Sequence, residues 1–251
     1  MTAIAVSCHV EVPLWDPAWR HLMRLQRSRP GGLAITALMR PPDHGTEPED
    51  VWLQRAREAA GQGPFGHHTH WGGLSTARPL PVEAGGPERP EERVRTEAVW
   101  LREHGLEPRF YCAGGWFMSE PLAGVLADEG YVDCSAPAFE PGFLDGQPRI
   151  SVAQPTWLSI EENGRRLLEL PSTHTLGMAV RLAMSGLRDA PPVVHVCFHD
   201  WELAHRRRRV ALRWALSVLG RRCRQLDLSE LAREASEDAG EVPFQSVFRS
   251  G

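Results

Sequence analysis

The feature that most constrains the fold of this chain is a repeated alternation between short apolar runs and longer amphipathic segments. The short runs predict strands near residues 3–10, 33–39, 65–70, 109–113, 131–134, 167–171 and 193–199. The longer segments predict helices near residues 16–28, 49–60, 91–104, 119–129, 175–187, 203–220 and 228–236. Such alternation is typical of a parallel sheet with helical crossovers. We therefore expect an α/β fold, with a single β/α barrel domain over residues 1–236 and a loosely held C-terminal tail over residues 237–251.

The first predicted strand shows which of its faces meets the helices. One face is apolar, and the other carries the small or polar side chains of Ala3, Ala5, Ser7, His9 and Glu11. In a β/α barrel the outer face packs on helices, and the carboxyl ends of the strands open on the site of chemistry. His9 and Glu11 are therefore expected at this mouth. The last predicted strand alternates in the same way and carries His195, Cys197 and His199 on its polar face.

Composition and charge exclude several classes of protein. The net charge of -4 argues against a nucleic-acid-binding protein, which usually carries a basic excess. Five scattered cysteines give neither a disulfide framework nor zinc-ribbon spacing. No apolar run reaches membrane-spanning length, and the chain enters a strand pattern at once, without an export-signal pattern before it. A reducing cytoplasm is the expected location, and the oligomeric state is not indicated.

His68-Thr69-His70 is the strongest chemical signal in the sequence. Side chains two residues apart on a strand point the same way, so His68 and His70 can share one metal ion, to which Glu11 adds an oxygen ligand. Such a set suits zinc or another first-row divalent ion, with positions left for water and substrate. The alternatives are polar loop histidines for the pair and a salt-bridged strand-end carboxylate for Glu11. His67 faces the other way and is interpreted as a structural or supporting residue.

A second candidate follows the last predicted strand, at His199-Asp200-Trp201-Glu202. A histidine at the end of a buried strand is well placed as a general acid or base, because its pKa lies near neutrality. The alternative is a helix N-terminus, at which Asp200 caps a helix beginning near Trp201. Both interpretations can hold at once. His195 lies deeper in the strand and is interpreted as a hydrogen-bonded core residue.

Residues at other predicted strand ends complete the candidate site. Cys112 and Trp116 flank Ala113 and two glycines and are candidates for contact with the substrate. The ring of Trp116 either walls a sugar pocket or is buried in a tight turn. Asp133 is predicted to orient a catalytic histidine, as supporting carboxylates do. His174 and Trp71 are further candidates for contact with the substrate.

A run of arginines over residues 206–209, continued by Arg213, Arg221, Arg222 and Arg224, is predicted to lie on a helix. The opposite side of this helix carries an apolar stripe. The run is interpreted as a solvated helix face. The alternative is a surface that attracts phosphate at the rim of the barrel.

Taken in order, these segments resemble the polysaccharide deacetylase (NodB-homology) superfamily. His9-Val10-Glu11 stands in the place of the first motif, and Gly66-His67-His68-Thr69-His70 is similar to the second, which supplies two metal histidines. The stretches 110–116 and 130–135 are similar to the segment that runs from the third motif into the next strand. Phe198-His199-Asp200-Trp201-Glu202 looks like the last motif, whose histidine acts as the acid. The resemblance spans nearly the whole chain and implies a distorted (β/α)7 barrel that removes acetyl groups from N-acetylated sugars with a metal ion.

Three positions depart from the pattern of that family. His9 replaces the usual first aspartate, the second histidine lies two residues after the first rather than four, and Cys112 replaces the usual arginine. The resemblance implies that Glu11, His68 and His70 hold a divalent metal ion, with zinc as the preferred identity. It also implies that the base at the first motif is either the imidazole of His9 or missing.

We therefore expect a metal-dependent amidohydrolase that acts on an N-acetylated sugar or a glycosylated metabolite, either free or linked to a nucleotide or a lipid. His9 would take the proton of the attacking water, and His199 would protonate the leaving amine. Two alternatives stay open. One is a barrel without turnover that binds carbohydrate or a partner, and the other is a hydrolase of cyclic amides.

Overall fold

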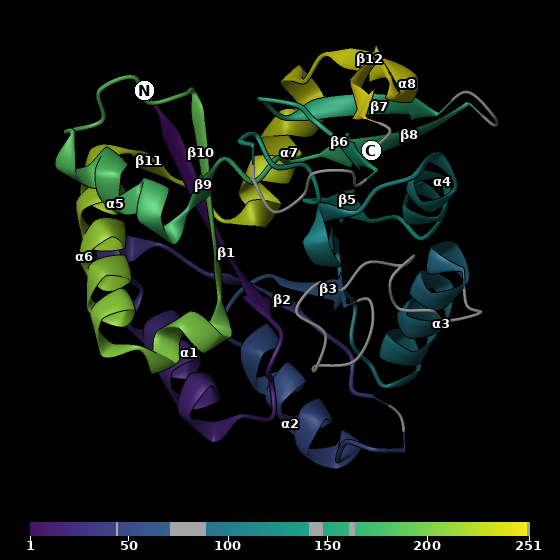
Figure 1. Cartoon of the computed structure of the whole chain (residues 1–251), viewed down its shortest axis with the longest axis horizontal. Helices are drawn as coiled ribbons and strands as arrows, with labels where there is room; N and C mark the ends of the chain where they lie inside the picture. Colours follow the sequence, from purple (N-terminus) through teal and green to yellow (C-terminus); the bar gives the residue numbers. More distant parts are fainter. Residues whose placement is uncertain (44, 71–88, 141–147, 161–163, 250–251) are drawn as a thin grey trace.

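A mostly parallel β-sheet forms the centre of the molecule, and helices lie along its outer face (Figure 1). The computed structural model describes residues 1–43, 45–70, 89–140, 148–160 and 164–249. The strands are β1 (Ala3–Val10), β2 (Thr36–Met39), β3 (Phe65–Thr69), β4 (Phe110–Ala113), β5 (Val132–Asp133), β6 (Arg149–Ile150), β7 (Thr156–Ile160), β8 (Arg165–Glu169), β9 (His174–Thr175), β10 (Val193–His199), β11 (Arg224–Gln225), β12 (Glu241–Pro243) and β13 (Phe248–Arg249). The helices are α1 (Asp16–Ser28), α2 (Glu49–Ala60), α3 (Pro90–Glu103), α4 (Glu120–Asp128), α5 (Leu176–Met184), α6 (Arg206–Arg222), α7 (Leu228–Asp238) and α8 (Phe244–Val247), with 3₁₀ turns η1 (Pro30–Gly32), η2 (Gly114–Trp116) and η3 (Asp200–Ala204). None of the described helices is long and apolar enough to cross a membrane.

The strand order confirms the predicted α/β architecture. Along the sheet it is β12-β7-β8-β5-β4-β3-β2-β1-β10-β9, with β11 beside β1. Neighbouring strands from β8 to β9 are parallel, and β7 pairs with β8 in the antiparallel sense. Parallel neighbours need crossover connections, and α1 to α4 follow β1 to β4 in turn. The carboxyl ends of β1, β3 and β10 therefore meet at one end of the sheet.

The two sides of the curled sheet approach one another at the segment that joins β8 to β9. Ser172 in this segment forms a bridge with Pro137, which follows β5. The next residue, Thr173, donates its backbone N–H to the carbonyl oxygen of His195 in β10 at 3.0 Å. No continuous strand ladder closes the sheet within the described ranges, so the barrel is distorted here. Ser172 and Thr173, in the segment between β8 and β9, therefore link the end of β5 to β10 where the two sides of the sheet do not pair directly.

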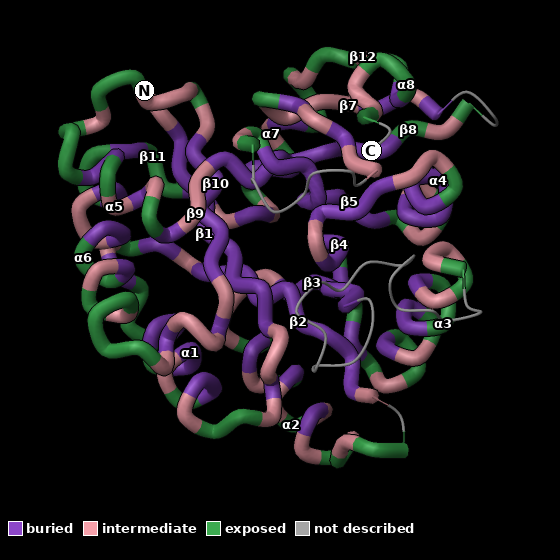
Figure 2. The backbone as a smooth tube through the Cα atoms, viewed as in Figure 1, coloured by how far each residue is buried: buried purple, intermediate pink, exposed green. Residues whose placement is uncertain are grey.

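Side chains of β1 alternate between two apolar cores. Its outward side chains pack with residues of α1, α5 and α6, and they are Ile4, Val6, Cys8 and Val10. Ala3 and Ala5 lie in a second cluster with Phe110 and Cys112, inside the curled sheet. Figure 2 shows the central strands buried along most of their length, while the outer surfaces of the helices are exposed. The faces predicted from the alternation are confirmed.

Gly66 in β3 shows how crowded the interior is below the strand ends. A Cβ atom on this residue would lie 2.6 Å from the carbonyl oxygen of Phe110 and 2.5 Å from Cδ2 of Leu38. A backbone carbonyl in a strand cannot move aside without breaking the ladder, so only glycine fits here. The close approach of β3 to β4 also fixes the position of His68, two residues further along β3.

Residues 241–249 belong to the fold, which corrects the expectation of a loosely held tail for this stretch. Strand β12 pairs with β7, and β13 pairs with β6. Between these strands Phe244 is only 1% exposed. The physical reason is that Phe244 fills part of an apolar cluster that also contains Leu122 and Leu158. Burial of the aromatic ring contributes about 1.5–3 kcal/mol toward holding this segment in place, in addition to its strand pairing.

Candidate functional site

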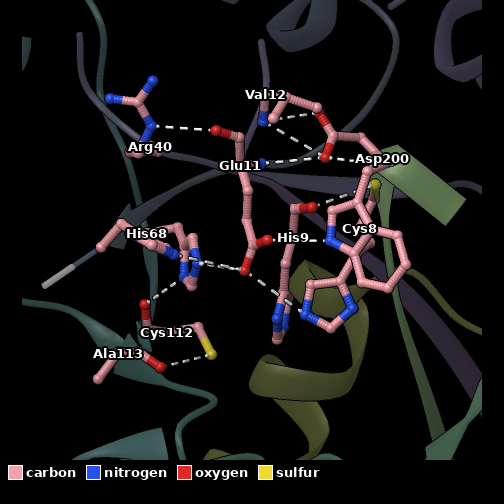
Figure 3. Close-up of polar contacts among 12 residues, drawn as sticks. Cys8, His9, Glu11, Val12, Arg40, His68, Cys112, Ala113 and Asp200 are labelled. Carbon is pink, nitrogen blue, oxygen red and sulfur yellow. Dashed lines mark hydrogen bonds and ion pairs between the residues drawn. The ribbon is translucent and has the colours of Figure 1, made fainter. Parts of the chain in front are cut away.

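The carboxylate of Glu11 lies at the centre of the candidate site, directly after β1 (Figure 3). Its Oε1 atom lies 3.7 Å from Nε2 of His68, 4.0 Å from Nε2 of His70 and 3.6 Å from Nε2 of His199. Trp201 donates its indole N–H to Oε2 of Glu11 at 3.0 Å. Burial alone would raise the pKa of Glu11, but its interactions with the imidazoles of His68, His199 and His70 lower that pKa well below its usual range. The carboxylate is therefore ionised.

Asp200 and Arg40 hold the backbone at Glu11 from two sides. The buried carboxylate of Asp200 accepts hydrogen bonds from the backbone N–H of Glu11 at 3.1 Å, of Val12 at 3.1 Å and of Trp201 at 2.9 Å. Arg40 donates its Nε–H to the carbonyl oxygen of Glu11 at 3.1 Å. Burial and the charge of Glu11 raise the pKa of Asp200 to about 7. Asp200 thus positions the end of β1.

The N-cap position of the turn η3, expected for Asp200, is occupied by His199, which interacts with Glu202. His199 is the N-cap residue of η3, and its backbone N–H donates to Oε2 of Glu202 at 3.0 Å. The imidazole of His199 lies with its Nδ1 atom 3.7 Å from the same carboxylate oxygen. Burial would lower the pKa of His199, but Glu202 and Glu11 raise it above its ordinary value. His199 therefore has a charged, proton-donating form available near neutral pH.

His68 points its Nε2 atom into the interior. Its Nδ1 atom lies 2.8 Å from the carbonyl oxygen of Cys112. A carbonyl oxygen can only accept, so Nδ1 carries a proton, and in the neutral ring Nε2 carries the lone pair. Nε2 of His68 is buried and accepts no hydrogen bond from the described part of the chain. This is the tautomer that a metal-binding histidine adopts.

His9 lies beside His68 and is buried on the same face of β1 as Glu11. Its ring stacks on that of His68 at a centroid distance of 5.1 Å and meets the ring of His199 edge-on, also at 5.1 Å. Burial, followed by the neighbouring imidazoles of His68 and His199, lowers the pKa of His9 well below its usual value. His9 is therefore neutral, and its Nε2 atom is also without a hydrogen-bond partner among the described residues.

These atoms offer two overlapping ligand sets for a divalent metal ion. One set is the predicted one of Glu11, His68 and His70. The other is His9, His68 and Cys112, whose ligand atoms all lie within 4.8 Å of one another. Burial raises the pKa of the Cys112 thiol well above its usual range, so a metal ion would have to displace its proton. Two buried imidazole nitrogens without partners beside an ionised carboxylate fit a divalent cation.

The remaining predicted residues differ in their distance from this cluster. Trp116 is 6% exposed and lies edge-on to His9 at 6.3 Å, so it is a buried wall of the site. The Nδ1 atom of His174 lies 2.8 Å from the hydroxyl oxygen of Thr173, and no described contact joins His174 to the cluster. Trp71 lies outside the described residues.

Asp133 lies on the other face of the sheet, where it pairs with Glu169 rather than with a histidine. Oδ1 of Asp133 accepts the hydroxyl proton of Ser135 at 2.6 Å, and its carboxyl group lies beside that of Glu169 on the neighbouring strand β8. Burial raises the pKa of both groups, and the Asp133 charge raises that of Glu169 further. The described hydrogen bonds of Asp133 reach no imidazole, so this placement does not support the predicted role in orienting a histidine.

The carboxyl pair predicts how stability depends on pH. Because the pKa of the pair is higher in the folded state than in the unfolded state, its contribution to stability is present at acidic pH and is lost as the pH rises through the folded-state pKa. In Glu169→Gln the amide would donate to Asp133 without a proton to lose. We expect the free energy of unfolding of the variant, relative to the parent, to increase with pH by up to about 1.4 kcal/mol per pH unit. Denaturant titrations at several pH values measure this difference.

Glu107→Gln provides the control, because Glu107 is exposed and remote from the pair in sequence. The difference in free energy of unfolding between Glu107→Gln and the parent should not show the increase with pH that is expected for Glu169→Gln. If the free energy of unfolding changed with pH in the same way for Glu169→Gln and the parent, a raised pKa of the Asp133–Glu169 pair would be contradicted.

His67 has the supporting role that was predicted for it. Its Nε2 atom lies 2.8 Å from Oε2 of Glu97, and its Nδ1 atom lies 3.0 Å from the hydroxyl of Tyr131. Burial would raise the pKa of Glu97, but the hydrogen bond with His67 lowers it to about 2. This network attaches the outer face of β3 to α3 and leaves His68 on the inner face.

Sequence reasoning missed Arg40 and Glu202. Arg40 follows β2 directly and is 3% exposed, with its guanidinium on Glu11 and on the carboxylate of Glu47. The rule that identified Glu11 and His199, a polar residue at a parallel strand end, would also have selected Arg40. Glu202 has no role of its own in the sequence interpretation, whereas in the structure its carboxylate contacts the backbone and the ring of His199.

The comparisons with known proteins concern the fold. No protein-family model matches the chain, and no curated protein matches it in sequence. A 4-alpha-glucanotransferase from Thermococcus litoralis is similar in structure, with a TM-score of 0.60 and 11% identity over 100% of this chain. This chain spans only 40% of the length of that protein. At such low identity the likeness shows the fold alone.

Two further similar structures cover most of both chains. One is a family 4 carbohydrate esterase from Streptomyces lividans in complex with acetate, with a TM-score of 0.47, 11% identity, and coverage of 93% of this chain and 90% of that one. The other, from Bordetella bronchiseptica, is described as a candidate polysaccharide deacetylase involved in O-antigen biosynthesis, with a TM-score of 0.44, 12% identity, and coverage of 92% and 90%. These TM-scores are too low to carry an argument about function, so the function must be argued from the site.

Proposed function

We propose that this protein is a metal-dependent hydrolase that removes an N-acetyl or related acyl group from a sugar or a glycosylated metabolite. The observation that carries the proposal is the ionised carboxylate of Glu11 among three imidazoles, beside two buried imidazole nitrogens without partners. Such an arrangement places metal ligands and proton-transfer groups together at the carboxyl ends of the parallel strands.

Each residue would have a distinct role at this mouth. Glu11, His68 and His70 would hold the metal ion, which when bound supplies Lewis-acid polarisation and a lowered pKa for water. His9 is neutral and would accept a proton from the attacking water. His199 would donate a proton to the leaving amine, since Glu202 stabilises its charged form.

The second ligand set distributes the roles differently. If His9, His68 and Cys112 hold the metal ion, His9 is no longer available to accept a proton. Glu11 would then be the proton acceptor, because its ionised carboxylate faces the same space. His199 keeps its role as the donor in both arrangements, and His68 is a ligand in both.

Acetate release from a panel of N-acetylated hexosamines tests the function. The panel contains free, nucleotide-linked and lipid-linked N-acetylhexosamines, each incubated with the protein and zinc, manganese or cobalt. We expect metal-dependent acetate release from at least one member, and release at the background rate from Glu11→Gln, because that variant loses the central negative charge.

Three other outcomes would contradict the proposal in different ways. Stoichiometric metal without acetate release, together with turnover of cyclic amides, would assign a different hydrolytic substrate. If the protein bound none of the divalent metal ions supplied but did bind sugars, it would be a carbohydrate-binding module rather than a hydrolase. Equal acetate release by Glu11→Gln would show that the site lies elsewhere.

A further inference from the structure

The outer face of α6 concentrates positive charge in a chain whose net charge is -4. Every charged residue of this helix is an arginine, and they begin at Arg206 and Arg207. Two apolar side chains are exposed beside these arginines and Arg213, namely Val210 (59% exposed) and Trp214 (44% exposed). Val210 and Trp214 are four residues apart on the helix, so their exposed side chains lie next to each other and form one small apolar patch among the arginines.

A groove runs along this face and continues onto α1. Its first part is lined by Arg206, Arg207, Val210, Ala211 and Trp214. Its second part is lined by residues of both helices, namely His21, Arg24, Leu25, Arg209, Val210 and Arg213. Val210 lines both parts, so the two parts are neighbours on the same flank of the molecule. Figure 1 shows these two helices side by side on the same flank of the molecule.

The arginines of this groove are not neutralised by the protein itself. Elsewhere on the surface, arginines such as Arg102 and Arg224 form ion pairs with glutamates. Arg24, Arg206 and Arg207, with Arg213, have no acidic partner among the described residues. His21 lies in the same groove, and burial together with the charges of Arg209, Arg24 and Arg20 lowers its pKa. The groove therefore carries an uncompensated positive potential.

We propose that this groove and the surrounding face of α6 dock on the surface of a lipid bilayer that contains anionic headgroups. Headgroup phosphates would contact the arginines, while Trp214 and Val210 would enter the interfacial layer, where amphipathic aromatic rings are favoured. A nucleic acid would also attract the arginines, but it offers no apolar layer for Val210. The combination of both residue types favours the bilayer.

The docking face is directly connected to the candidate site. Arg208 lies over the ring of Trp201 at 5.4 Å, and its guanidinium lies 3.4 Å from the carboxylate of Glu202. Glu202 in turn contacts His199. A bilayer on α6 would therefore lie next to the turn that carries the proposed proton donor. The docking itself does not depend on the hydrolytic activity, so the two proposals can fail separately.

Vesicle flotation with the full chain tests the docking. The probes are vesicles of phosphatidylcholine alone and vesicles of phosphatidylcholine mixed with phosphatidylglycerol. We expect binding to the mixed vesicles only, reduced on the order of 100-fold in the triple variant R206Q/R207Q/R213Q, because each arginine near an anionic surface contributes roughly five-fold in affinity. Trp214→Ser should weaken binding further without changing its dependence on salt.

The triple variant R109Q/R233Q/R249Q is the matched control. It removes the same charge at exposed arginines outside α1 and α6, and it should bind the mixed vesicles like the parent. Equal loss in both triple variants would show a net-charge effect and overturn the proposal. Absence of binding by the parent, or binding to a DNA duplex without binding to vesicles, would also overturn it. Far-ultraviolet circular dichroism verifies that all variants are folded.

Discussion

The variant His68→Ala is expected to bind no divalent metal ion at concentrations that saturate the parent protein. His68 belongs to both ligand sets, its Nδ1 proton is fixed on the carbonyl oxygen of Cys112, and its Nε2 lone pair faces the other ligands. Loss of a supporting hydrogen bond to a ligand already costs about 10- to 100-fold in metal affinity, so loss of the ligand itself should cost more. Metal content after equilibrium dialysis measures the effect.

His67→Gln is the control for this variant. His67 lies one residue away on the opposite face of β3, and its partners are Glu97 and Tyr131. Its replacement by another polar side chain should leave the metal content unchanged. A His68→Ala variant that kept stoichiometric metal would place the ion outside both sets.

Cobalt binding distinguishes the two ligand sets. A thiolate ligand gives a sulfur-to-cobalt charge-transfer band in the near ultraviolet, which nitrogen and oxygen ligands do not give. If Cys112 is a ligand, the band appears in the parent and is lost in Cys112→Ala, while His70→Ala keeps it. If Glu11, His68 and His70 hold the ion, the band is absent and His70→Ala loses the metal.

Much of this site could be predicted because it depends on local rules. Alternation along β1 and β10 assigned the inner face correctly, and the parallel order then brought Glu11, His68 and His199 to one mouth. These steps need only the period of a strand and the direction of parallel chains. The structure places Nε2 of His199 within 3.6 Å of Glu11, although the two residues are far apart in the sequence.

The parts that could not be predicted depend on nonlocal contacts. The alternation of β5 indicates that Asp133 faces away from Val132, but it does not show which side chain meets it there. Glu169 reaches Asp133 because β8 lies beside β5, and β8 is held in an antiparallel pair with β7. The hairpin and the strand β12 that extends it follow from the tertiary packing of Phe244, not from a local pattern.

His199→Ala should keep the metal ion and lose most of the rate of acyl-group removal. The ring of His199 belongs to neither ligand set, although its Nε2 atom lies 3.6 Å from Glu11. General acid catalysis contributes about 100- to 10,000-fold, so kcat should fall by that factor on an N-acetylated amine. His205→Ala provides the control, because His205 is exposed at the end of the same turn.

The choice of leaving group separates proton donation by His199 from a structural role. An amine leaves only after it has been protonated, whereas a nitrophenolate leaves without a proton. If His199 is the donor, His199→Ala should therefore hydrolyse a nitrophenyl ester almost as fast as the parent, while its rate on the amide collapses. A structural role would lower both rates together, since the same displaced Glu11 and metal ion would serve both substrates. Equal losses on the amide and the ester would remove His199 from the proposed mechanism and leave the origin of the leaving-group proton to another residue.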